Sequence, residues 1–256
     1  MTALFAIARR ELGAYFATPI GWICLTAFTL LSGMFYVLDL IYYNQMLGDS
    51  VMNPSMASQL NINDAILAPW FGQLGVTALL ITPALSMRLL AEDRRSRAIE
   101  LLLTSPISSY SIAFGKLLGA AGFAAVIIAG TLPGIGILFA LGDPDRGVVG
   151  TNLLGIYLLT VALMSMGLFF SALTENQIVA LVLAFGCGLV LWIVGWGGEF
   201  GDEGALKTVL NYISLPTHME DMGNGLLRAK SLAYFLTFIG FFGFATAQRV
   251  EALRWR

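Results

Sequence analysis

Six separate runs of apolar residues, each long enough to cross a lipid bilayer as a helix, constrain this chain more than any other feature. A bilayer core is spanned by ~20 consecutive apolar residues in an α-helix. Backbone polar groups cannot stay unpaired in lipid, so each run must form a helix. The sequence therefore predicts an all-α integral membrane protein with a single transmembrane domain over residues 1–256. Its six transmembrane helices are expected at residues 20–41, 66–90, 111–141, 153–173, 178–196 and 232–247.

The small share of charged residues supports the same conclusion. Only 12% of the 256 residues are charged, whereas about a quarter is usual in soluble domains. A water-soluble globule could not cover its surface with so few charges, but lipid accepts an apolar exterior. Lys and Arg number 14 against 16 Asp and Glu. Because there is no basic excess, we expect no nucleic-acid partner.

The distribution of basic residues predicts the orientation of the spans. Six spans place both termini on one side, and Lys and Arg concentrate on the cytoplasmic side of membrane proteins. The side of the termini carries ten of the 14 basic residues and the other side carries four. Both termini are therefore expected in the cytoplasm. The ten residues are Arg9, Arg10, Arg88, Arg94, Arg95, Arg97, Lys116, Arg249, Arg254 and Arg256.

Three segments outside the spans have patterns of their own. Residues 1–17 place apolar side chains at helical spacing, which predicts an N-terminal amphipathic helix lying in the cytoplasmic membrane interface. Arg9, Arg10 and Glu11 are its candidate functional residues. Residues 43–65 are polar and predict an external loop. Residues 198–230 predict short external helices that are broken at Pro216.

The densest polar patch lies between the second and third spans, on the predicted cytoplasmic side. Five consecutive polar or charged residues, 92–96, precede an apolar stretch that includes Ile99, Leu101 and Leu102 and ends at Pro106. Such a pattern suits a docking helix, whose apolar residues anchor in the membrane domain while its charges meet a soluble partner. The alternative from composition alone is a solvated loop that only obeys the positive-inside rule.

Ionisable residues inside the spans are scarce. Asp39, Arg88 and Lys116 lie near span ends, where snorkelling to the interface accounts for them. No series of Asp, Glu or His could relay protons, which disfavours a secondary carrier or an ion pump. The glycine-rich stretches at 115–119 and 130–134 predict close helix contacts within the chain. The second of these, with Pro133, predicts that the third span is tilted or kinked.

No signature of catalysis or cofactor binding is present in the sequence. A phosphate-binding loop needs GxxxxGK[ST], but Leu117 follows the only Gly-Lys pair. Cys24 and Cys187 lie in apolar runs, and a single histidine, His218, cannot hold a metal alone. We expect a chain that is not an enzyme and carries no cofactor or metal of its own.

Two blocks of the sequence resemble a known family. Residues 68–120 and 212–227 are similar to the gliding-motility-type permeases of the type-two ABC exporter superfamily. The first block contains APW, a span that ends in a proline and Met-Arg, an acidic–basic turn, ELLLTSP and a Gly-Lys pair. The second reads YISLPTHMEDMGNGLL. The matching residues of the first block are Pro83, Met87, Arg88, Glu92, Arg94, Glu100, Leu102, Pro106, Gly115 and Lys116.

This resemblance implies a permease subunit of an ABC exporter in the bacterial cytoplasmic (inner) membrane. A cytoplasmic coupling helix between spans 2 and 3 would dock on a separate ATPase subunit that binds the ATP, helped by the N-terminal helix. The partners implied are that ATPase, a second identical or related permease, and a companion membrane protein with a periplasmic domain. The candidate docking residues are Glu92, Arg94, Arg95, Glu100, Leu102 and Pro106, with Arg94 and Glu100 foremost.

The sequence departs from the family pattern at one point, and it leaves two alternative functions open. Arg97 and Ala98 stand where the family usually has Gly-Thr, which predicts a more helical turn. A self-contained channel or carrier is one alternative, and a membrane scaffold or force-transmitting subunit of an envelope complex is the other. Charge-poor spans favour a lipidic, lipid-linked or polypeptide cargo, but the substrate itself is not identified.

Overall fold

A computed structural model describes residues 3–52, 61–199 and 205–254, and it contains no strand within these ranges. All six predicted spans are confirmed as helices that are long and apolar enough to cross a membrane. The predicted spans stop short of the helix ends by up to 11 residues, at the end of α2, because polar residues extend several helices past the apolar run. The spans are α2 (Pro19–Met52), α4 (Ala68–Ser86) followed by α5 (Arg88–Arg95), α7 (Ser109–Ala129) followed by α8 (Leu132–Leu141), α9 (Arg146–Leu173), α10 (Gln177–Glu199) and α13 (Ala229–Arg254).

Within the described ranges, five shorter elements connect or flank the spans. The external loop predicted at 43–65 is wrong in part, since α2 continues through Met52, and residues 53–60 lie outside the described ranges. No proline interrupts this part of α2, and one glycine inside a helix costs only about 1 kcal/mol. The short elements are α1 (Ala3–Ala17), the π-helix η1 (Asn63–Leu67), α6 (Ala98–Thr104), α11 (Ala205–Ile213) and α12 (Leu215–Gly223).

The two short helices predicted between the fifth and sixth spans are present, but the break between them is not at Pro216. Ser214 adopts an extended conformation between α11 and α12, and Pro216 lies in the first turn of α12. A proline is tolerated there because the first helical N–H groups have no partner within the helix. Residues 200–204, which precede α11, lie outside the described ranges.

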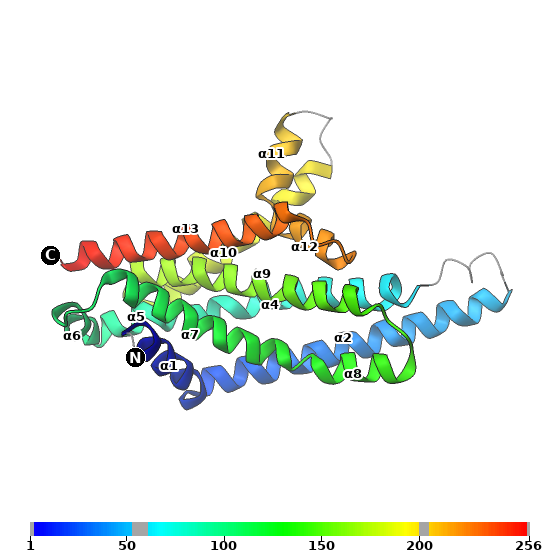
Figure 1. Cartoon of the computed structure of the whole chain (residues 1–256), viewed down its shortest axis with the longest axis horizontal. Coiled ribbons are helices and arrows are strands. Elements are labelled where there is room, and N and C mark those ends of the chain that lie inside the picture. Colours follow the sequence, from blue (N-terminus) through cyan, green and yellow to red (C-terminus); the bar gives the residue numbers. More distant parts are fainter. Residues whose placement is uncertain (1–2, 53–60, 200–204, 255–256) are drawn as a thin grey trace.

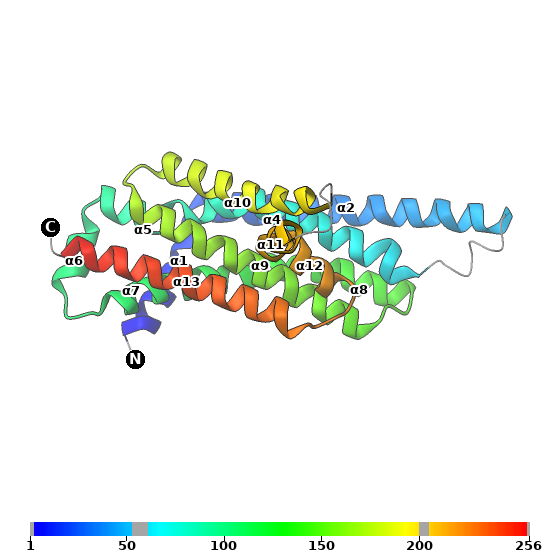
Figure 2. The same ribbon diagram turned by 90° about the horizontal axis from the view of Figure 1, so that it is seen from above.

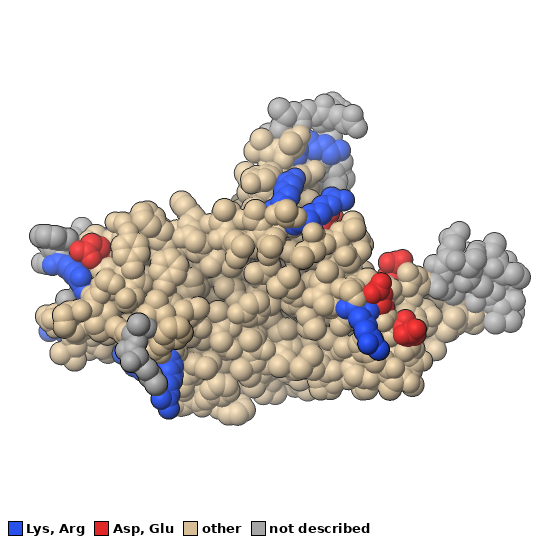
Figure 3. Space-filling model, viewed as in Figure 1, with Lys and Arg blue, Asp and Glu red and all other residues tan. Residues whose placement is uncertain are grey.

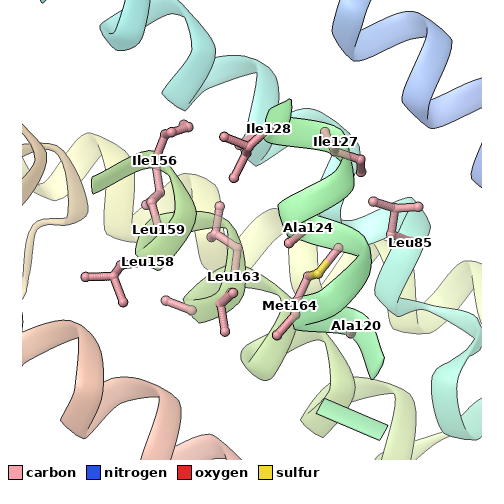
Figure 4. Packing of buried hydrophobic residues seen from close by; sticks show 14 of the residues in the cluster. Leu85, Ala120, Ala124, Ile127, Ile128, Ile156, Leu158, Leu159, Leu163 and Met164 are labelled. Atoms are coloured by element: carbon pink, nitrogen blue, oxygen red, sulfur yellow. The ribbon is translucent and has the colours of Figure 1, made fainter. Parts of the chain in front are cut away.

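Helix α9 forms the centre of the bundle and packs against α4, α7, α10, α12 and α13. Most residues of α4, α7 and α9 are buried, whereas α2, α8, α10 and α13 leave most of their residues at least partly exposed. In Figure 4, Ile128 of α7 points toward Ile156 of α9, whereas Ile127 lies on the other side of α7, toward Leu85 of α4. Exposed apolar side chains on outer helices are expected when lipid, and not water, surrounds them.

The third span is interrupted as predicted. Helix α7 ends at Ala129, and α8 begins at Leu132 with Pro133 in its first turn. A Cβ atom placed on Gly130 would stand 2.6 Å from Thr29 Oγ1 of α2, and one on Gly134 would stand 2.9 Å from the ring of Trp70 in α4. These two glycines therefore serve close contacts within the chain, as the sequence indicated.

The bundle is elongated, with both termini at one end together with α5 and α6 (Figure 1). The view from above in Figure 2 shows the same grouping. Helix α11 stands off the side of the bundle. On the face drawn in Figure 3, charged side chains gather at the two ends and around α11, and the middle of the bundle carries none. This distribution fits a protein whose middle lies in hydrocarbon.

Candidate functional site

The end of the bundle that holds both termini is built around the contact between α1 and α7. Gly115 and Gly119 of α7 face α1: a Cβ on Gly119 would lie 2.7 Å from Glu11 Cβ and 2.8 Å from the Ala8 carbonyl oxygen. The buried residues of α1 are Ile7, Glu11 and Tyr15. The small-residue stretch at 115–119 thus serves to bring α1 and α7 together within one chain.

Lys116 lies between those two glycines and is buried, with a side chain only 1% exposed. Its Nζ is 2.7 Å from Glu11 Oε1 of α1 and 2.6 Å from Asp93 Oδ2 of α5. Arg10 Nη2 donates to the same Glu11 oxygen at 2.7 Å. We call Arg10, Glu11, Asp93 and Lys116 the charge cluster. It joins three helices that are far apart in the sequence.

The cluster determines the protonation of Glu11. Burial opposes ionisation of this carboxyl, but the ion pairs with Lys116 and Arg10 outweigh burial and hold the pKa of Glu11 below its usual value. Glu11 is therefore ionised near neutral pH. Two carboxylates around one ammonium group are the arrangement that makes a buried lysine tolerable.

The snorkelling interpretation of the charged residues near span ends is wrong. Besides Lys116, Arg88 is 8% exposed, donates from Nη1 to Thr18 Oγ1 at 2.6 Å, and lies over the ring of Tyr15. Asp39 is also 8% exposed and accepts a hydrogen bond from Gln73 Nε2 at 3.2 Å. Each finds a polar partner on another element, which is less costly than exposing a charge to lipid.

A break at Met87 separates α4 from α5, and Ser171 of α9 fills it. Ser171 Oγ accepts hydrogen bonds from the backbone N–H groups of Leu90 and Ala91 at 3.0 and 2.9 Å, and donates to the Met87 carbonyl at 2.8 Å. The sequence analysis missed this residue. A serine inside an apolar run has no signal that separates it from serines bonded to their own helix.

Arg94, one of the two foremost docking candidates, has partners within the chain. Its Nη1 donates to the Ala172 carbonyl at 3.0 Å, and its Nη2 pairs with Glu175 Oε1 at 3.1 Å. Its side chain is only 14% exposed. Arg94 therefore fastens α5 to the loop between α9 and α10.

The turn between α5 and α6 is not more helical than the family pattern. Helix α5 ends at Arg95, and Arg97 adopts the left-handed conformation with φ 59° and ψ 10° before α6 begins at Ala98. That conformation is the one glycine adopts at little cost. The expectation from Arg97-Ala98 is wrong because the backbone keeps a glycine-type turn with an arginine in it.

The remaining candidates divide between exposed and packed positions. Ile99 is buried and Leu102 packs against the core, as an anchoring face requires. Leu101 does not anchor, because its side chain is 77% exposed. Among the residues that the sequence analysis singled out in α1 and between the second and third spans, the exposed ones are Arg9, Arg10, Glu92, Arg95, Arg97, Glu100, Leu101 and Pro106.

Together these contacts give a helical hairpin, α5–α6. Its outer surface carries exposed polar and apolar side chains, and its inner surface is attached to the bundle. The charge cluster attaches it to α1 and α7, and Ser171 and Arg94 attach it to α9. Such a unit can transmit a displacement between the aqueous phase and the spans, because close-packed and paired elements move together.

Comparison with known proteins identifies the family. No curated protein gives a significant match to this chain. The family model described as ABC-2 family transporter protein matches residues 5–240, which is most of the chain. With its six apolar helices, the chain belongs to the ABC-2 transporter family and is a multi-pass transmembrane permease of that family.

Proposed function

We propose that this chain is the permease subunit of an ATP-driven exporter and that α5, its turn and α6 form the coupling element that docks on a separate ATPase. The observation that carries the proposal is the construction of the α5–α6 hairpin. Its outer side chains are exposed, while the charge cluster, Ser171 and Arg94 bind it to α1, α7 and α9. ATP binding and hydrolysis then belong to the partner chain, and this chain acts without a cofactor.

The exposed docking residues would make the polar contact with the ATPase. Glu92, Arg95 and Glu100 are exposed and available, with Leu101 and Pro106 beside them in the sequence. Arg94 contributes indirectly, because it holds α5 against α9. Closure of the ATPase would push the hairpin, and the paired groups behind it would carry the movement to α1, α7 and the central helix α9.

The wider assembly follows from the family and the charge distribution. The permease would work as a pair, of two identical or two related chains, in a bacterial inner membrane with both termini in the cytoplasm. The gliding-motility resemblance adds a companion membrane protein with a periplasmic domain. Spans with few charges suit a lipidic, lipid-linked or polypeptide cargo.

A pull-down from detergent-solubilised native membranes tests the docking element. We expect an ATPase with a phosphate-binding loop to co-purify with the wild type and to be lost with Glu100→Arg. The control is Asp143→Arg, which makes the same charge reversal at an exposed residue in the turn between α8 and α9, at the other end of the bundle. Loss with both variants, or retention with Glu100→Arg, would contradict docking through α6.

A second measurement separates a transporter from a scaffold or force-transmitting subunit. The complex is reconstituted in liposomes, and its ATP hydrolysis is followed as lipid and peptide fractions of the envelope are added. A permease predicts hydrolysis that rises with one fraction and accompanies its movement across the bilayer. Hydrolysis without movement of any fraction would favour the scaffold, and transport without the ATPase would favour a self-contained carrier.

A further inference from the structure

A cleft of about 290 Å³ lies in the opposite half of the bundle, between α12 and the near ends of α4, α9 and α10. It lies far from the α5–α6 hairpin in the fold (Figure 1), so nothing proposed about the ATPase depends on it. Its volume is near the lower end for small-molecule sites. The lining residues are Ala68, Phe71, Gly72, Gly75, Asn152, Trp192, Pro216, Met219, Glu220, Gly223 and Asn224.

Asn152 lines the cleft and carries a buried acceptor that has no hydrogen-bond partner among the described residues. The residue is 0% exposed, and its Nδ2 donates to the carbonyl oxygens of Val148 and Gly223 at 2.8 and 3.0 Å. Two carbonyl partners fix the orientation of the amide, because only the nitrogen can donate to them. Its Oδ1 is buried and has no hydrogen-bond partner within the part of the chain that the structure describes. A lone buried acceptor costs about 1–3 kcal/mol, so the site is suited to a ligand that donates.

The other lining groups indicate what kind of donor fits. The described lining residues include the rings of Phe71 and Trp192 and the carboxylate of Glu220, and none of them is Lys, Arg or His. Aromatic rings and carboxylates attract cations, and an amide oxygen accepts from ammonium N–H groups. We propose that this cleft binds the primary ammonium group of a small amphiphile, from either a phosphatidylethanolamine-type headgroup or a free amine.

Two glycines of α4 shape the cleft in different ways. A Cβ on Gly75 would lie 2.9 Å from the ring of Trp192, so this glycine lets the indole pack against α4. A Cβ on Gly72 would meet nothing within 4 Å. A larger side chain at Gly72 therefore fills the cleft without displacing the protein around it, which makes Gly72→Leu a suitable blocking variant.

The test uses purified protein in phosphatidylcholine nanodiscs, with phenethylamine as the probe and tryptophan fluorescence as the signal. Trp192→Phe assigns the signal to the cleft. We expect a saturable change that Gly72→Leu abolishes and that Asn152→Leu weakens by about tenfold, the equivalent of one hydrogen bond. Gly136→Leu is the matched control, since Gly136 is an exposed helical glycine of α8 that also has open space around it.

Two further arms complete the experiment. Propylbenzene has a similar apolar body without the ammonium group, and it should give no saturable change. Equal binding of propylbenzene, or a phenethylamine signal that survives Gly72→Leu, would overturn the proposal. Nanodiscs with phosphatidylethanolamine in place of phosphatidylcholine identify the source. Competition with phenethylamine supports a lipid headgroup, and undiminished phenethylamine binding supports a free amine.

Discussion

At the scale of single residues, Lys116 carries a positive charge that is shared by carboxylates from two other helices. Lys116→Met keeps a side chain of similar length but leaves Glu11 and Asp93 with only the half-exposed Arg10 as a counter-ion. Because breaking a buried ion pair leaves an uncompensated charge, we expect a loss of about 3 kcal/mol. Thermal unfolding of the detergent-solubilised protein measures this loss.

Arg9→Met is the control for that measurement. Arg9 is exposed on α1, so the same removal of a positive charge should change the stability by no more than about 0.5 kcal/mol. An unfolding temperature of Lys116→Met equal to that of Arg9→Met would show that the charge cluster contributes nothing to holding α1, α5 and α7 together.

Glu11 predicts a dependence of stability on pH. Its pKa lies below the usual value near 4.5, so the unfolded chain binds the proton more readily than the folded one. The stabilisation is complete above about pH 4.5 and is lost as the pH falls through the lower, folded value. In Glu11→Gln, stability at neutral pH should be lower and should decline less on acidification. The measurement is the unfolding temperature of the wild type and of Glu11→Gln as a function of pH across this range. Parallel curves for the two proteins would exclude Glu11 as the titrating group.

Arg97 predicts a stabilising substitution. A non-glycine residue in the left-handed conformation destabilises the folded chain by about 1–2 kcal/mol. Replacing it with glycine removes this cost, but part of the gain is lost because glycine has more backbone entropy in the unfolded chain. Arg97→Gly should therefore raise stability by about 0.5–1 kcal/mol. Arg95→Gly, the same change two residues earlier in the last turn of α5, should lower it. Opposite signs in thermal unfolding are expected, and equal signs would contradict the left-handed turn.

At the scale of elements, the docking of α1 depends on the absence of side chains on one face of α7. Gly119→Ala places a Cβ 2.7 Å from Glu11 Cβ and 2.8 Å from a backbone oxygen of α1. The helices must separate, at a cost of about 1–3 kcal/mol. We also expect less ATPase in the pull-down, because the charge cluster is pulled apart.

Gly122→Ala serves as the comparison for the α1–α7 contact. Gly122 is one turn further along α7, and a Cβ there would make ordinary contacts of 3.5 Å with the side chain of Leu12. This variant should unfold at the wild-type temperature or above it and should retain the ATPase. Similar behaviour of the two alanine variants would mean that α1 does not need the close approach.

At the scale of the whole molecule, the grouping of both termini with α5 and α6 predicts one orientation in the membrane. Cys24 and Cys187 are first replaced by Ala, and single cysteines are introduced as Glu100→Cys and Asp143→Cys. A membrane-impermeant maleimide should label the second in intact spheroplasts and the first only after permeabilisation. The reverse pattern would place the termini and the proposed coupling element outside the cytoplasm.

The sequence by itself determined the number and the helical nature of the spans. Runs of ~20 apolar residues have no stable form in lipid except the helix, so the six spans and the break near Pro133 follow from local composition. The acidic–basic turn also located the α5–α6 segment, because its charges cannot enter the hydrocarbon. The same local reasoning failed at residues 43–52, where a polar helix in water carries no hydropathy signal.

Only the tertiary structure decided which partner each polar group finds. Lys116, Glu11 and Asp93 come from three separate helices. A hydropathy profile does not distinguish a lysine near a span end that snorkels from one that is buried. Ser171 and Arg94 likewise depend on how α9 lies against α5. Periodicity predicts that a residue faces inward but not what faces it, because side-chain pairing is a property of two packed surfaces. The cleft beside Asn152 exists for the same reason, since four separate elements enclose it.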